Sequence, residues 1–502
     1  MLTAALLPFS CAAQEASPLS AIDWLSDSVD ETAALPPTNE TPAASLPTEV
    51  AVLPLDTPVA DAAGLFEAAD LDLDPGIWGR SAAADLARSL ARIPDTAEGP
   101  PAARRFLNRL MLARLNAPID AAVDETFFLA RLDWLLGHAH LDDAKALIEA
   151  AGPVDPQRFR RLFDIAILKG EETQVCRQVE EAPDLSPTYP ARIFCLARLG
   201  QWDVAALTLG NAETLDILSD DEEQLLLHFL DPELFEGEPV PAPPLRPTPL
   251  EFRLYEAVGE RIATDRLPTA FAAADLTETV GWKTRLRAAE RLAAAGALPV
   301  EALLDVYAER KPAASGGVFE RVRAVMALTR ALDARDADEA NETLSPAWSA
   351  AREAGYAPAL AVWMAPRLDG LALTGPAAHT GFEIALFAGE PKLARSLANS
   401  SAQDRFLLAL ATGSGGAVPT DPLGRAVLRG LSALGPGESY VALIEDDRRG
   451  EALFRALEQL SGGGAAGNPD ATAQSLALLR ALGLDALARR VAIELILMEG
   501  AA

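Results

Sequence analysis

The chain has 502 residues, with 43 basic and 73 acidic side chains and a formal net charge of −30 at pH 7. This charge disfavours nucleic acid as a partner, because such binding is driven by Lys and Arg neutralising phosphates. An anionic membrane surface is disfavoured for the same reason. Three cysteines and four histidines leave little material for a zinc or iron–sulfur site, so no cofactor is expected. The length fits about three domains or one long repeat array.

Residues 2–13 read as an apolar segment that ends in small residues, a pattern typical of a secretory signal. The segment is too short to span a bilayer, which takes about 20 residues. No Lys or Arg precedes Arg80, so the usual basic start of a signal is missing. Cys11 is an alternative as a lipid-modified cysteine, although Pro8-Phe9-Ser10 matches that signal poorly. We predict a signal peptide over 1–13 and a periplasmic protein, with a cytoplasmic location as the alternative. No other apolar run is long enough for a transmembrane helix.

Residues 14–75 are rich in Pro, Thr, Ala and acidic side chains, a composition that predicts a disordered tail. Within it, Ile22, Leu25 and Val29 share one face of a predicted short helix over 18–29, next to Trp24. A helix this short is marginal in water on its own. We therefore interpret Ile22, Trp24, Leu25 and Val29 as a candidate interaction motif. The alternative is an apolar patch in a linker without a function.

From Ser81 onward the apolar residues have helical spacing, and strand signals are rare, so the sequence predicts an all-α fold. Ser81 is the expected N-cap of the first helix. A recurring turn ends one helix at a glycine, which accepts the left-handed conformation, and places a small or aliphatic residue five positions later. It occurs at Gly170, Gly200, Gly389 and Gly483.

The glycines of these and similar turns are separated by 30 to 34 residues: Gly137, Gly170 and Gly200, then Gly355 and Gly389, then Gly450 and Gly483. This is the period of tetratricopeptide (TPR) hairpins. The sequence therefore predicts a degenerate TPR-like α-solenoid of helical hairpins.

Two segments hold most of the negative charge. Residues 1–79 carry 13 acidic side chains and residues 199–245 carry 11, and neither has a basic one. The second segment runs into a proline-rich stretch, which precludes a helix. We place an acidic linker at 231–249, between helical-repeat halves over 76–230 and 250–502.

Cys176 and Cys195 are 19 residues apart, on two predicted helices separated by Pro183–Pro190. An antiparallel helix pair can bring such positions within disulfide distance, and an oxidising envelope favours pairing. The alternative is two small buried hydrophobic residues.

No catalytic constellation is found, so we predict a protein that is not an enzyme. His138 and His140, with Asp142 and Asp143, are of metal-ligand type, but they lie in a predicted turn where polar residues are expected anyway. Glu438-Ser439 matches a pair found in lytic transglycosylases, yet capping of a helix explains it better. Gly462–Gly467 lacks the Lys and Ser/Thr of a phosphate loop and is interpreted as a connector.

Two arginine clusters lie in the first half: Arg104, Arg105 and Arg109, then Arg158, Arg160 and Arg161. We interpret them as solvated helix faces with pairs inside each helix. A basic ledge for the acidic tail is the alternative.

Three stretches carry a family resemblance: 175–200 with both cysteines, 229–254, and Ser20-Ala-Ile-Asp-Trp-Leu25. Together they resemble a family of exported bacterial TPR-like helical-repeat proteins, some of whose members carry the label "antifreeze glycopeptide polyprotein". The resemblance implies an exported helical-repeat protein with two paired cysteines, and it brings no catalytic residues.

The predicted function is a non-catalytic periplasmic α-solenoid scaffold that binds a protein or peptide partner in the cell envelope, since stacked helix pairs form long concave surfaces. The alternative is a cell-wall-acting enzyme, or an accessory of one, by analogy with helical cell-wall hydrolases.

Overall fold

The computed structural model describes residues 59–94, 99–121, 125–152, 154–313, 315–414, 418–419, 421–462 and 468–499. The predicted signal peptide and the motif residues Ile22, Trp24, Leu25 and Val29 lie outside the described residues. Within these ranges the chain is mostly helical, as predicted. The described residues also contain one short parallel pair of strands, β1 (Phe66–Glu67) and β2 (Ala113–Arg114). No helix of the described part is long and apolar enough to cross a bilayer.

The helices follow one another with short connections. The first group is η1 (Ala60–Ala62), η2 (Ala68–Leu71), α2 (Ala83–Ala91), α3 (Pro101–Leu112), α4 (Thr126–Gly137) and α5 (Leu141–Ala150). The second is α6 (Pro156–Lys169), α7 (Glu172–Glu181), η3 (Pro183–Leu185), α8 (Tyr189–Arg198), α9 (Trp202–Thr214), α10 (Asp220–Leu230) and α11 (Pro249–Ala257). The third is η4 (Thr264–Arg266), η5 (Thr269–Leu276), α12 (Trp282–Ala295), α13 (Val300–Ala308), α14 (Val318–Ala334), α15 (Ala337–Glu353), α16 (Ala357–Leu368) and α17 (Gly375–Ala388). The last is α18 (Pro391–Leu397), α19 (Ala402–Thr412), α20 (Pro422–Ser432), η6 (Glu438–Tyr440), α21 (Val441–Glu445), α22 (Arg449–Ser461), α23 (Pro469–Ala481) and α24 (Asp485–Glu499).

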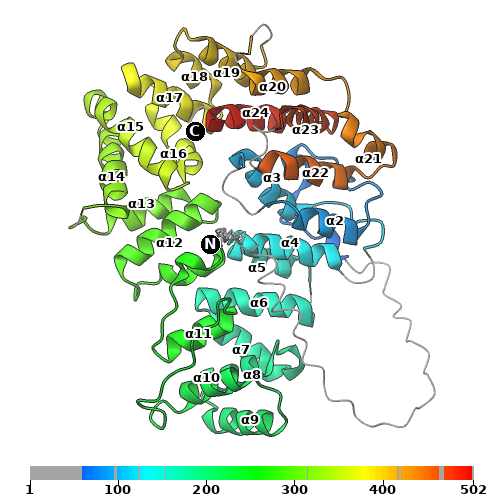
Figure 1. Ribbon diagram of the computed structural model, residues 1–502, viewed down its shortest axis with the longest axis vertical. Coiled ribbons are helices and arrows are strands. Elements are labelled where there is room, and N and C mark those ends of the chain that lie inside the picture. The colour runs from blue at the N-terminus through cyan, green and yellow to red at the C-terminus, as the bar shows by residue number, and fades with distance from the viewer. Residues whose placement is uncertain are drawn as a thin grey trace, which may run out of the picture.

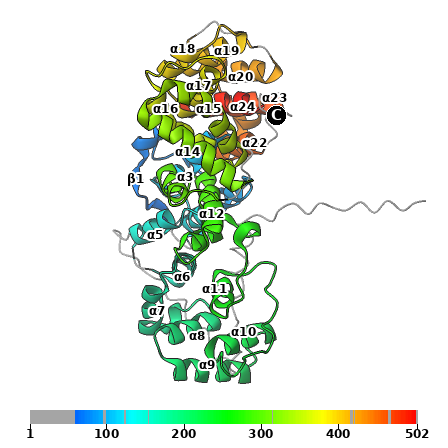
Figure 2. The same ribbon diagram turned by 90° about the vertical axis from the view of Figure 1, so that its left-hand side faces the viewer.

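The chain runs outward from α5 to α9, reverses, and returns through α11 to α12 (Figure 1). We call residues 156–257, from α6 to α11, the distal arm, and the other described residues the body. In both views the distal arm forms one end of an elongated molecule (Figure 2). The irregular stretch 231–248 between α10 and α11 coincides with the predicted linker. The main cluster of buried hydrophobic residues nevertheless runs from Ala60 to Leu497, through arm and body. The division into two halves stays a prediction.

The C-terminal helices close the body against the N-terminal ones, since α24 packs on α3 and α22 packs on α2. Glu494 of α24 is fully buried and accepts a hydrogen bond from the backbone N–H of Ala102, at the start of α3, at 2.5 Å. Its other oxygen pairs with Arg105 at 2.8 Å and with Arg490 at 3.5 Å. A carboxylate at a helix N-terminus also interacts favourably with the helix dipole.

Gly450 allows the closest approach at this closure. A Cβ at this position of α22 would lie 2.6 Å from Leu86 Cδ2 and 2.8 Å from Trp78 Cε3. Contacts this short require neighbouring atoms to move, so the position favours glycine.

The recurring glycine turn has the predicted geometry. Gly170, Gly200, Gly389 and Gly483 have φ values of 72°, 82°, 78° and 83°, in the left-handed region. The residues five positions later, Val175, Ala205, Ala394 and Ala488, are all buried. The turn after α4 differs: Gly137 is helical, and Ala139 takes the left-handed position with a φ of 63°.

Part of the predicted tail belongs to the body instead. Residues 59–75 include η1, β1 and η2, with Leu71 and Leu73 buried. Arg131 of α4 anchors the start of this segment by donating to the carbonyl oxygens of Asp61 at 3.0 Å and Ala63 at 2.8 Å. Burial lowers the pKa of Arg131 to about 10, and the charge of Asp61 acts in the opposite direction. Local composition does not reveal this anchor, because Arg131 is some 70 residues away.

The predicted cap of the first helix is also wrong. Ser81 is buried, and α2 begins two residues later, at Ala83. The backbone N–H of Ala83 donates to Asp120 Oδ1 at 2.7 Å. A side chain from a distant loop thus supplies the acceptor that a local N-cap would supply.

The second arginine cluster is not a solvated face, whereas Arg109 of the first cluster is exposed as predicted. Arg158 and Arg161 are 6% and 5% exposed. Arg158 pairs with Glu125, and Arg161 makes two hydrogen bonds to Asp133 at 2.6 and 2.8 Å. These pairs join different helices or loops, so these arginines stabilise packing between elements rather than within one helix.

We expect Glu494→Gln to lower the free energy of unfolding by roughly 3 kcal/mol, because it removes the buried charge that holds α24 to α3. Urea denaturation followed by circular dichroism measures the loss. Glu499→Gln, on the exposed end of the same helix, is the matched control and should leave stability unchanged. Equal stability of the two variants would show that the pair does not stabilise the closure.

Candidate functional site

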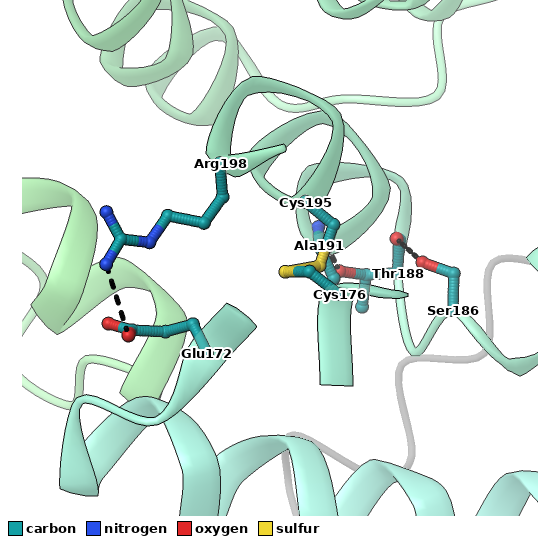
Figure 3. The surroundings of a disulfide bond; sticks show 7 residues. All are labelled: Glu172, Cys176, Ser186, Thr188, Ala191, Cys195 and Arg198. Carbon is teal, nitrogen blue, oxygen red and sulfur yellow. Dashed lines mark hydrogen bonds and ion pairs between the residues drawn. A yellow bond between two sulfur atoms is a disulfide. The ribbon is translucent and has the colours of Figure 1, made fainter. Parts of the chain in front are cut away.

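Cys176 of α7 and Cys195 of α8 form a disulfide in the distal arm, as predicted (Figure 3). The two Cα atoms are 4.8 Å apart, and the side chains are 0% and 2% exposed. The bond therefore joins the two helices of one hairpin from inside their interface.

Polar contacts fix both ends of this hairpin (Figure 3). Thr188 Oγ1 accepts a hydrogen bond from the N–H of Ala191 at 3.2 Å and so caps α8, while Ser186 donates to the Thr188 carbonyl at 2.9 Å. At the opposite end, Arg198 lies 3.8 Å from the buried Glu172. The hairpin is therefore a rigid base for α9, which follows directly.

Arg253 attaches the returning helix α11 to the same hairpin. Its Nε lies 3.0 Å from Glu172 Oε1, and its Nη2 donates to the carbonyl of Ile167 at 2.8 Å. Ile167 is near the end of α6, where carbonyls lack partners within the helix. One arginine thus joins α6, α7 and α11 and holds the outgoing and returning chains together.

A groove of about 670 Å³ lies beside the hairpin. The connector before α8 forms one wall and the turn between α9 and α10 another, with Arg160, Tyr189, Arg192 and Glu222 among the lining residues. Arg160 donates to the carbonyl of Pro187 at 3.2 Å, and burial lowers its pKa. The groove is therefore lined by both charged and apolar side chains.

The outer side of α9 carries exposed apolar side chains among polar ones such as Asn211. Val204, Leu207 and Leu215 are 47%, 66% and 61% exposed. Positions i, i+3 and i+11 fall on one side of a helix with about 3.6 residues per turn. We call these three residues the α9 face. The opposite side of the helix, with Ala205, Leu209 and Ala212, is buried against the arm.

Acidic side chains surround the α9 face. The segment 199–245 contains α9 and α10 and carries the 11 acidic and no basic residues noted above. Asp203, Glu213 and Asp216 are exposed on or next to α9, and Asp220 and Asp221 begin α10. The pKa of Glu223 is raised by desolvation and by the nearby charges of Glu213 and Asp220.

The histidines considered as metal ligands have structural partners. His138 is buried and stacks on Trp134, whose carbonyl lies 2.8 Å from His138 Nδ1. His140 contacts Asp143 at 2.9 Å and Asn108 at 2.7 Å. Among the described residues, no group of three or more His, Cys, Asp and Glu is arranged to hold a metal ion.

A buried ionisable cluster lies in the body, where α12, α13, α14 and α16 meet. Tyr307 donates to Glu290 Oε1 at 2.6 Å and lies 3.0 Å from the Tyr356 hydroxyl, and Arg321 binds both oxygens of Glu290 at 2.9 and 2.6 Å. Burial raises the pKa of both tyrosines. Each side chain of the cluster makes a hydrogen bond to another side chain of the cluster, as is typical of a network that stabilises helix packing.

Comparison with protein-family models, with curated proteins and with solved structures finds no match for this chain. The structure brings Cys176 and Cys195 together, whereas the candidate motif of the tail lies outside the described residues. Sequence reasoning missed the α9 face. Its signal is present, because α9 has leucine or valine on two opposite sides, and one layer of neighbours covers only one of them.

We expect Cys176→Ala/Cys195→Ala to lower the free energy of unfolding by about 3 kcal/mol, since the bond closes a loop of moderate length in the unfolded chain. Urea denaturation with and without dithiothreitol measures the loss. The reductant should destabilise the natural protein to a similar degree and leave the double variant unchanged. Alkylation of Cys176 or Cys195 in denatured, unreduced protein would contradict the pairing.

Asp164 of α6 predicts a pH dependence of stability. Burial raises its pKa to about 7; Arg160 and Arg161 act against this shift and Asp133 adds to it. From about pH 4 to about pH 7 the folded protein keeps a proton that the unfolded chain has lost, so stability falls as the pH rises through this window. Asp164→Asn should flatten that slope in urea denaturation curves recorded across it. The exposed Asp184→Asn is the control, and an unchanged slope in Asp164→Asn would refute the assignment.

Proposed function

We propose that this chain is a non-catalytic scaffold of the periplasm, in a Gram-negative-type cell envelope, which holds a protein or peptide partner. The α9 face carries the proposal. Large contiguous apolar patches on a protein surface mark interaction sites, and the α9 face gathers three exposed apolar side chains on one side of a helix. Trp202, at the start of α9, is also 49% exposed and contacts Phe229 of α10.

The disulfide supports export. Disulfides persist in oxidising compartments such as the bacterial periplasm and are rare in the cytosol. Cys176 and Cys195 close one hairpin of the arm, and the family resemblance implies the same pairing. The rival cytoplasmic location would keep both thiols reduced.

The glycine turns support a degenerate TPR-like α-solenoid in the arm and in parts of the body. Gly170, Gly200, Gly389 and Gly483 share the left-handed conformation, and each precedes a buried small or aliphatic residue. A hairpin that turns this way cannot bury its apolar face alone and packs on its neighbours, which is the logic of repeat proteins.

The alternative, a cell-wall-acting enzyme or its accessory, would need ionisable groups that face a substrate. The cluster of Glu290, Tyr307, Tyr356 and Arg321 is the strongest candidate in the described residues. Its tyrosines are each 1% exposed and bond to other members of the cluster, and this favours a structural role.

Site-specific photo-crosslinking in intact cells tests the proposal. A photoreactive residue in place of Leu207 should crosslink to one discrete envelope protein, because Leu207 lies on the α9 face. Leu434, fully exposed after α20 in the body, is the matched control and should give little product. Equal products at the two positions, or a protein that stays in the cytoplasmic fraction, would contradict the proposal. If the Trp24→Ala protein gives the same crosslink, the tail motif takes no part in this interaction.

A further inference from the structure

The α9 face lies where a stack of helices normally ends in a polar surface. Terminal helices of repeat arrays carry a polar outer side, because no further repeat covers them. α9 is the outermost helix at the reversal of the distal arm (Figures 1 and 2) and packs on α8 and α10. Among its exposed polar residues, such as Asn211, it also presents the apolar side chains of Val204, Leu207 and Leu215 to solvent. An uncovered apolar face at this position indicates a partner that covers it.

The charge around the face restricts that partner. Segment 199–245 has 11 acidic side chains and no basic one, so the acidic groups have no cation within the segment. Complementary charge steers association and suppresses wrong partners, and like charges placed together cost binding energy. A partner that covers the face therefore needs a basic rim around an apolar centre.

Two other possible occupants of the α9 face, the chain's own tail and a second copy of the chain, do not complement its negative charge. The tail of the chain is acidic, since residues 1–79 carry 13 acidic side chains and no basic one. A second copy that used the same face would bring a second acidic segment against the first, as a two-fold interface requires. Both arrangements place like charges opposite each other around the apolar residues.

We propose that the α9 face binds a basic amphipathic helix of a partner protein. The inference rests on the proposed scaffold function and names its partner class. A helix with Leu, Ile or Val at i, i+3 or i+4 and i+7 presents an apolar side that can cover Val204, Leu207 and Leu215. Lys and Arg on its flanks meet Asp203, Asp216 and the acidic start of α10.

Fluorescence anisotropy with the full chain tests this partner class. The probe is a labelled peptide of about 18 residues with Leu on one helical face and Lys and Arg on the other. A peptide of the same composition in scrambled order and one with Glu in place of the basic residues are the controls. We expect binding of the first peptide only, and weaker binding as salt rises from about 50 to about 300 mM, because screening weakens exposed charge pairs.

The decisive variant keeps the charge constant. Val204→Gln/Leu207→Gln should weaken binding about tenfold or more, as expected for the loss of central apolar contacts of an interface. Leu434→Gln, a change of the same kind far from the arm, should have no effect. Equal binding by the natural chain and the double variant would overturn the inference, because attraction by charge alone would then explain it. A dimer in sedimentation that the double variant dissociates would also overturn it and assign the face to a second copy. Either result would refute this partner class without refuting the scaffold function, which the crosslinking experiment tests separately.

Discussion

Helix ends buried inside a protein must find donors for their last carbonyl groups, and at several ends here an arginine of another helix supplies one. Arg253 of α11 donates to Ile167 at the end of α6, Arg490 of α24 to Phe387 at the end of α17, and Arg480 of α23 to Leu431 at the end of α20. A guanidinium offers several donors on a long side chain, so it bridges two helices that pack at their ends. The chain accordingly has 38 arginines and five lysines. The bonded residues of these three pairs lie 49 to 103 residues apart in the sequence, so the arginines join helices that are distant along the chain.

These contacts also explain how the charge is distributed. An arginine that binds a carbonyl or a buried carboxylate stabilises packing between helices. Arg105 does so with Glu494, and Arg161 does so with Asp133. Most of the net charge of −30 therefore resides in segments without arginine. Segment 199–245 is one of them, and it is held at its borders by Arg198 and Arg253, which both approach Glu172. The distal end keeps its acidic groups exposed because no internal cation is placed among them.

The sequence predicts the features that local chemistry determines. A glycine followed five residues later by alanine or valine specifies a left-handed turn and a close helix contact, so the turns at Gly170 and Gly389 were predictable. The pairing of Cys176 with Cys195 follows from two neighbouring helices. The cap of α2 by Asp120, the anchor of residues 59–63 by Arg131 and the closure of α24 on α3 by Glu494 were not predictable in this way. Their partners lie between 37 and 392 residues apart in sequence.

The closure of the body and the exposure of α9 are connected. An open array of hairpins has two ends that must be capped by polar faces. Here α22 and α24 cover α2 and α3, so the first and last α-helices of the described fold pack on each other through Glu494 and the close contact at Gly450. The exposed end of the described fold is then the reversal at α9, at the opposite end of the molecule from α18 and α19 (Figure 1). Stability of the body does not depend on covering that helix, since its buried side packs on α8 and the disulfide holds α8 to α7. Its outer side can therefore carry exposed apolar residues without weakening the fold.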